Sequence, residues 1–329
     1  MRLLRLTVIK LVVVRVPPGG APMRIRTHRL ALLVALFVVL GIPASGNAAD
    51  REPMIVSTAW LAEHQNDENL VIIQAGNPQD YRDGHIPGAQ LLDLNEISTA
   101  MEAEFMTQLR PVPQLKAALE KTGMSDNSRV VIYFSRNWVT AASRVYWTLD
   151  YLGLADRASF LDGGLNAWKA EKRPVATEVR EVKPGSITPR VREAVLAQVD
   201  WVSASLNKPG ITILDARTPE FYEGKEMGSH AGRRGHIPGA RNVPFTSLMD
   251  EKTLVFKDAS ALQELFRAAG VKPGDTVVTY CHIGLQASLL YFAARYLGYD
   301  ARMFDGSFEE WSNRKDLPVE GPSEKPITP

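Results

Sequence analysis

The chain has 329 residues, 45% of them hydrophobic and 23% charged, so it is long enough for two ordinary domains and its composition predicts a compact globular protein. Nothing in the composition indicates nucleic-acid binding. The formal net charge of +1 is unevenly distributed, because seven basic and no acidic residues precede position 47. The remainder carries 31 basic against 37 acidic residues, a net charge of −6.

Residues 1–48 are predicted to be an N-terminal extension followed by a signal peptide, with Met23 as the expected start. A basic stretch leads into thirteen mostly aliphatic residues (30–42) and then into small residues that offer a cleavage site near 44–46. The aliphatic run is shorter than the roughly 20 residues that a transmembrane helix needs. We therefore expect an exported, periplasmic protein with no membrane attachment after cleavage, and an uncleaved anchor is the alternative.

The rest of the sequence contains a duplication. Each copy has, in the same order, an apolar run, GHIPGA, a strand that leads into a helix, and DGxxxxW, at 69–81, 84–89, 129–134 and 162–168 in the first copy and at 210–222, 235–240, 275–281 and 305–311 in the second. A shared order over more than a hundred residues indicates two copies of one fold.

Each copy alternates short β-branched runs with helical patterns, which predicts an α/β domain with a mainly parallel sheet flanked by helices. Apolar residues at helical spacing over 112–124 and 261–271 predict one such helix in each copy, ending at a glycine. We place the domains at 52–176 and 192–322. They are joined by a linker at 177–191 that is rich in proline, glycine and mixed charge.

The single cysteine, Cys281, follows the apolar strand of the second copy and precedes a helix. Ligands of parallel sheets bind beyond the carboxyl ends of the strands, where unpaired amides and the helix dipole favour anions. We therefore predict a reactive thiol with a pKa below its ordinary value of about 8.5. Gly284 lets the loop curl around the sulfur. The first copy has Phe134 at the equivalent position, so it is expected to wall the site or bind substrate.

Taken together, these features resemble the tandem-domain rhodanese-type sulfurtransferases. The resemblance rests on GHIPGA in both halves, on LDAR at 214–217, on Cys281-x-x-Gly284-x-x-Ala287, on DGxxxxW, and on a first domain without cysteine. It implies two rhodanese-like domains, of which only the second is catalytic. It also implies that Cys281 takes a sulfane sulfur from a small-molecule donor, becomes a persulfide, and passes the sulfur to cyanide or a thiol. No metal or organic cofactor is required.

The predicted site has two parts. The loop after the cysteine is expected to bind substrate and comprises His282, Ile283, Gly284, Leu285, Gln286 and Ala287. An anionic donor should also meet cationic side chains, for which we propose Arg217, Arg233 and Arg234, with structural ion pairs as the alternative. The last two end a long loop (224–235) that the first copy lacks.

Other polar residues near the loop receive different predictions. His282 is expected to adjust the charge of the loop or to touch substrate, and Asp215 to hold loop amides or Arg217. The histidine of GHIPGA occurs in both copies, which favours a structural role over a metal site.

The donor depends on the two residues after the cysteine. Thiosulfate-using relatives typically have CRKG and mercaptopyruvate-using relatives CGSG, whereas this chain has CHIG. We predict a thiosulfate sulfurtransferase, with 3-mercaptopyruvate as the alternative donor and a non-catalytic persulfide carrier as the alternative function. A Cys-dependent phosphatase with a C-x5-R loop is excluded because residue 287 is alanine. Oligomeric state and physiological acceptor are not predicted.

Overall fold

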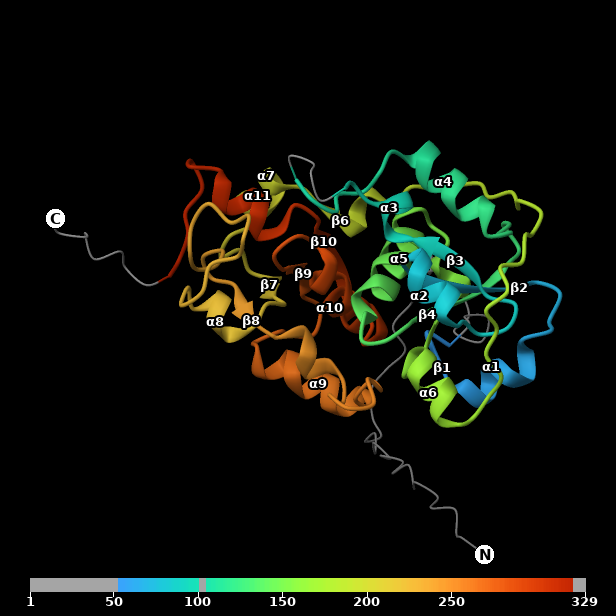
Figure 1. The fold of residues 1–329 in the computed structure, drawn as a ribbon. Coiled ribbons are helices and arrows are strands. Elements are labelled where there is room, and N and C mark those ends of the chain that lie inside the picture. The colour runs from blue at the N-terminus through green and yellow to red at the C-terminus, as the bar shows by residue number, and fades with distance from the viewer. Residues whose placement is uncertain (1–52, 101–104, 322–329) are drawn as a thin grey trace, which may run out of the picture. The chain divides into compact units, whose positions relative to one another are not determined.

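The computed structural model describes residues 53–100 and 105–321. The predicted signal peptide lies outside these residues. Two five-stranded parallel sheets form the framework (Figure 1). The first has the order β1-β5-β4-β2-β3, and the second has the order β6-β10-β9-β7-β8. The strands are β1 (Ile55–Val56), β2 (Leu70–Gly76), β3 (Gln90–Asp93), β4 (Arg129–Phe134), β5 (Ala158–Leu161), β6 (Leu196–Ala197), β7 (Ile211–Asp215), β8 (Arg241–Asn242), β9 (Thr276–Tyr280) and β10 (Asp300–Phe304).

The second order repeats the first strand for strand, which confirms the predicted α/β fold and its duplication. Helices flank both sheets, as parallel strands require of their crossover connections (Figure 1). The α-helices are α1 (Thr58–His64), α2 (Pro78–Asp83), α3 (Leu94–Ile97), α4 (Val112–Lys121), α5 (Val139–Tyr151), α6 (Gly164–Ala170), α7 (Val199–Ala204), α8 (Pro219–Tyr222), α9 (Ala259–Ala268), α10 (Leu285–Tyr296) and α11 (Ser307–Asn313).

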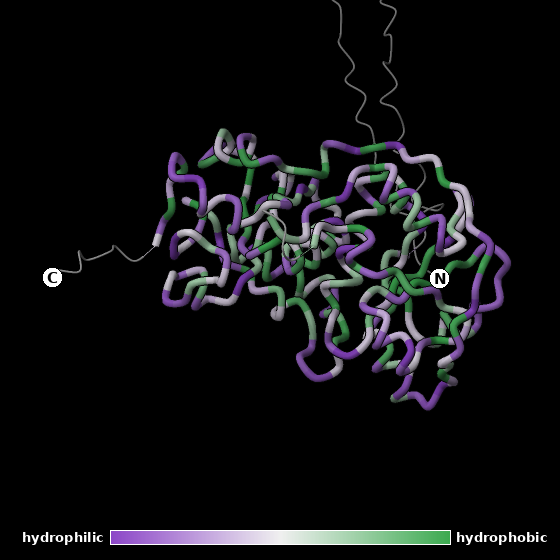
Figure 2. The backbone as a smooth tube through the Cα atoms, turned by 45° about the horizontal axis from the view of Figure 1, so that its top comes forward, coloured by the Kyte–Doolittle hydropathy of each residue, from purple (hydrophilic) through white to green (hydrophobic). Residues whose placement is uncertain are grey.

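The predicted helices at 112–124 and 261–271 correspond to α4 and α9. Gly123 and Gly270 follow them in left-handed conformations, at φ 85° and 87°, as helix ends prefer. Hydrophobic stretches of the chain gather toward the middle of the molecule, and hydrophilic stretches are more frequent in its outer loops (Figure 2). Among the described residues, none of the helices is long and apolar enough to cross a membrane.

The two GHIPGA segments make the same contacts in both halves. His85 Nδ1 lies 2.9 Å from the carbonyl oxygen of Tyr81, and the two rings stack with centroids 3.8 Å apart. His236 repeats this arrangement with Tyr222, at 2.8 Å and 3.9 Å. The structural role predicted for these histidines is confirmed.

Helices α5 and α10 occupy equivalent places in the two halves and pack against each other (Figure 1). Ser143 Oγ and Ser288 Oγ are 2.8 Å apart, and Tyr146 meets Phe292 edge-on with ring centroids 4.8 Å apart. One hydrophobic core contains residues of both helices. Because α5 follows β4 and α10 follows β9, this packing brings the segment after Phe134 to the loop that carries Cys281.

Candidate active site

Cys281 follows the last residue of β9, and its side chain is 0% exposed. Its N–H donates to Ser307 Oγ at 3.2 Å, which ties the start of the loop to the start of α11. The N–H of Gly284 donates to Cys281 Sγ, also at 3.2 Å. The loop therefore curls around the sulfur as predicted, with an amide directed at it.

The electrostatic balance at the sulfur differs from the prediction. Burial raises the pKa of the Cys281 thiol, and the backbone N–H groups of Ala287, Ile283 and Gly284 oppose this only in part. The predicted lowering of the pKa is therefore wrong for this structure, because removing the thiolate from water outweighs the loop amides.

Gly284 is the residue before the first turn of α10, and its φ of 88° lies in the left-handed region. A Cβ atom at this position would lie 2.9 Å from the carbonyl oxygen of Asp305 and 3.0 Å from Arg144 Nη1. Both conformation and space therefore require glycine.

A cavity of about 310 Å³ is lined in part by Cys281. Its lining comes from both halves and consists of Asn137, Trp138, Thr140, Phe245, Cys281, His282, Ile283, Leu285 and Gln286. The first three belong to the cysteine-less half, which thus walls the site. Gln286 Oε1 is buried without a hydrogen-bond partner among the described residues.

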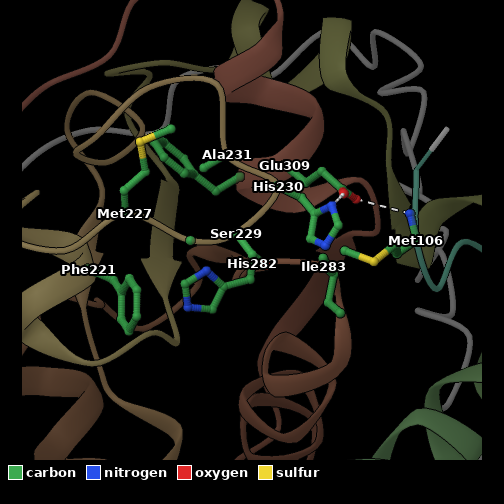
Figure 3. A pocket seen from close by; sticks show the side chains of 11 residues that line it. Met106, Phe221, Met227, Ser229, His230, Ala231, His282, Ile283 and Glu309 are labelled. Atoms are coloured by element: carbon green, nitrogen blue, oxygen red, sulfur yellow. Dashed lines mark hydrogen bonds and ion pairs between the residues drawn. The ribbon is translucent and has the colours of Figure 1, made fainter. Parts of the chain in front are cut away.

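A second cavity of about 260 Å³ lies beside the same loop (Figure 3). His282 and Ile283 line both cavities. The loop 224–235, which the first copy lacks, contributes five of the lining residues, 227–231. The ring of His230 faces Glu309, whose carboxylate accepts the N–H of Met106 at 3.0 Å (Figure 3).

His282 is held in its neutral form. Burial and the nearby Arg217 lower its pKa to about 4, and its ring meets Phe221 edge-on at 4.6 Å. The expectation that a partly protonated His282 adjusts the charge of the loop is therefore wrong. Its position on both cavities agrees with the other expectation, contact with substrate.

Arg217 is 1% exposed, and its guanidinium group is held within the second domain. It donates to both carboxylate oxygens of Asp215 and to the carbonyl oxygen of Gly235, and it packs over the ring of Phe308 at 4.1 Å. It lines neither cavity beside Cys281. The structure thus confirms Asp215 as the partner of Arg217. The two residues form a structural ion pair, which is the alternative expected for this arginine.

Arg233 and Arg234 also line neither cavity. Arg233 donates to four carbonyl oxygens at and beyond the end of α11, those of Trp311, Ser312, Arg314 and Leu317. A cation at a helix C-terminus satisfies carbonyl groups that lack intrahelical partners. Arg234 donates to the carbonyl oxygen of Lys225 on the surface. Because none of the three arginines lines a cavity beside Cys281, we do not propose them as donor-binding residues.

A model of the rhodanese-like domain matches residues 57–171 and 198–314. The chain belongs to the rhodanese family. Thiosulfate sulfurtransferase of Azotobacter vinelandii is 31% identical over 274 residues, covering 82% of this chain and 97% of that protein. 3-Mercaptopyruvate sulfurtransferase of Escherichia coli is 30% identical over 278 residues, covering 80% and 97%.

The rhodanese fold is also seen in the crystal structure of an Escherichia coli 3-mercaptopyruvate sulfotransferase, with a TM-score of 0.69 and 27% identity. The match covers 78% of this chain and 99% of that one. The chain is thus a tandem-domain sulfurtransferase of the rhodanese family, and its relatives differ in the donor that they are named for.

Sequence reasoning missed the residues that this rhodanese draws from its first domain. Trp138 lines the Cys281 cavity, Arg144 lies behind Gly284, and Thr107 donates to the carbonyl oxygen of Ile283. A signal existed for Trp138, because it lies in the segment equivalent to the cysteine loop. Thr107 and Arg144 are 176 and 161 residues from their partners in the second domain, and no local pattern marks such contacts.

Proposed function

We propose that this chain moves a sulfane sulfur from thiosulfate to cyanide or a thiol through a persulfide on Cys281. The observation that carries the proposal is the setting of the one thiol in the chain. It lies in a cavity at the end of β9 with the N–H of Gly284 directed at its sulfur. The equivalent residue of the first half, Phe134, is buried in the core.

The proposed cycle has two displacement steps. The Cys281 thiolate attacks the outer sulfur of thiosulfate, a bond between the two sulfurs forms, and sulfite leaves with the electron pair of the broken S–S bond. Cyanide or a thiolate then attacks the outer sulfur of the persulfide, and the electron pair of that S–S bond returns to Cys281. Amides that are already oriented toward the sulfur support both anionic forms without reorganisation.

The donor is the finer part of the proposal. Thiosulfate is favoured because His282 and Ile283 replace the Gly-Ser pair that is typical of mercaptopyruvate-using relatives. None of the described residues that line the two cavities is lysine or arginine. We therefore expect the anion to be bound by the backbone N–H groups of the loop together with neutral side-chain donors such as Gln286.

A carrier is the second candidate, since the sulfur carrier protein TtuD of Thermus thermophilus is 31% identical over 284 residues. Steady-state assays with thiosulfate plus cyanide, and with 3-mercaptopyruvate plus a thiol, distinguish these functions. Turnover with thiosulfate supports the proposal, and turnover only with mercaptopyruvate reassigns the donor. Persulfide formation without turnover on either pair indicates a carrier.

We also propose export to the periplasm, on the strength of the signal-like sequence in residues 1–48. Sequencing the N-terminus of the protein recovered from the periplasmic fraction tests this. A mature end near 44–49 supports cleavage, and recovery of the uncut chain with the membranes contradicts it.

A further inference from the structure

The peptide group between Ile283 and Gly284 is hydrogen-bonded on both sides. Its N–H, on Gly284, donates to Cys281 Sγ at 3.2 Å. Its C=O, on Ile283, accepts from the hydroxyl of Thr107 in the first domain. A peptide group is planar, so whatever fixes the direction of its C=O also fixes the direction of its N–H. The Thr107 hydroxyl and the Cys281 sulfur therefore bind opposite sides of one planar group.

Thr107 has an unusual backbone conformation. Its φ is 56°, in the left-handed region that β-branched residues rarely adopt, and it is 6% exposed. Such conformations occur where the surroundings hold them, and they concentrate at functional sites. Thr107 N–H donates to the carbonyl oxygen of Thr99 at 3.3 Å, and Arg144 Nη2 donates to the carbonyl oxygen of Thr107. Thr107 is thus held at both its backbone groups while its hydroxyl reaches the catalytic loop.

The segment around Thr107 is in turn anchored to the second domain. Asp305 Oδ1 pairs with Arg144 Nη1 at 2.5 Å, and Asp305 Oδ2 accepts the N–H of Leu109 at 2.8 Å. One carboxylate therefore holds both the residue that positions Thr107 and the chain just after it. The contacts form a continuous path from Asp305 through Arg144 and Thr107 to the peptide group at the sulfur.

We propose that Thr107 is a positioning residue for Cys281, which orients the Ile283–Gly284 peptide so that its N–H stabilises the anionic sulfur. This positioning role of Thr107 rests on the persulfide function proposed above. Hydrogen bonding at the carbonyl also polarises the same peptide group and strengthens the bond that its N–H donates. The cysteine-less domain thereby completes the catalytic loop of the other domain, beyond walling the cavity.

The pH profile of Cys281 alkylation by iodoacetamide tests this on the full chain. Thr107→Val keeps the shape of the side chain and removes the hydroxyl, so alkylation at neutral pH should fall about tenfold and the midpoint should move to higher pH. Thr107→Ser restores the hydroxyl and should restore the profile. Ser143→Ala removes another buried hydrogen bond between the domains, the one to Ser288, and should leave the profile unchanged.

Thr107→Gly provides a second test if the valine variant does not fold. Glycine adopts the left-handed conformation without strain. If the role of Thr107 were purely structural, this variant would be stable and its alkylation pH profile would match the wild type. The positioning role predicts a stable protein with the same upward shift as Thr107→Val. A profile that superimposes on the wild type in either variant overturns the proposal, as does an equal shift in Ser143→Ala.

The result is independent of the proposed transfer reaction, since alkylation needs no sulfur donor. A wild-type protein that forms no persulfide would contradict the proposed function, and the alkylation profiles would still decide the role of Thr107.

Discussion

Arg144 of the first domain and Asp305 of the second form a buried ion pair, with Nη1 and Oδ1 2.5 Å apart, directly behind Gly284. Arg144 is 0% exposed, and its guanidinium also packs over the ring of Trp147 at 4.5 Å. The loop that carries Cys281 therefore packs against an arginine supplied by the half that lacks the cysteine.

Replacing Arg144 with methionine should destabilise the protein strongly. Of its side-chain hydrogen bonds within the described residues, Asp305 would keep only the one from the Leu109 N–H, and it would remain as a buried charge without its cation. Breaking a buried pair in this way costs about 3–5 kcal/mol. The loss in the free energy of unfolding is measured by urea denaturation. The control is Lys121→Met, which breaks a pair with Glu96 whose lysine is 70% exposed and should cost under about 1 kcal/mol. Equal losses in the two variants would contradict the account.

Gly284→Ala should reduce both stability and sulfur transfer, because the new methyl group would meet Asp305 and Arg144. Gly270→Ala is a matched control, since Gly270 has φ 87° but no atom within 4 Å of the added carbon. Both variants bear the cost of alanine in a left-handed conformation, about 1–2 kcal/mol. The excess loss in Gly284→Ala reports the contact alone, and no excess would show that the loop has room for a side chain.

The pH dependence follows from the two shifted groups in the loop. Because burial raises the pKa of Cys281, the rate of persulfide formation should rise with pH through a midpoint above about 8.5. His282, with its pKa lowered to about 4, should add no step between pH 5 and 8. The folded protein binds the thiol proton more tightly than the unfolded chain. This contribution to stability is therefore complete below the unfolded pKa and is lost as pH rises through the folded one. The rate prediction is checked by measuring single-turnover persulfide formation against pH. A midpoint below about 8.5 would contradict it.

Arg233→Met should affect stability and leave donor binding intact. Four carbonyl oxygens around the end of α11 would lose their donor, at a cost of about 1–3 kcal/mol. The KM for thiosulfate should stay at the wild-type value, measured on enzyme kept well below its melting temperature. A KM that rises with stability unchanged would instead return Arg233 to the donor site, as first expected from the sequence.

The duplication, the parallel sheets and the placement of Cys281 could be read from the sequence, because each depends on local pattern and on a repeated order of motifs. The equivalence of Phe134 and Cys281 could be predicted for the same reason, from the alignment of the two copies. Because the two sheets have the same strand order, aligned residues of the two copies occupy equivalent positions in the fold.

The side chains that decide the electrostatics of the site could not be read in this way. An arginine after a strand looks the same whether it faces a cavity or, like Arg217, pairs with the aspartate two residues before it. The pKa of Cys281 depends on burial, which is created by packing the whole of α5 and α10. Thr107 reaches the loop through a backbone conformation that its residue type does not favour.

The most direct test of the central claim is mass spectrometry of the protein after brief exposure to thiosulfate without an acceptor. We predict that the peptide containing Cys281 gains the mass of one sulfur atom and loses it when cyanide is added, while Cys281→Ser shows neither change. A wild-type protein that turns over thiosulfate and cyanide without this added sulfur, or a serine variant with activity near the wild type, would contradict the account.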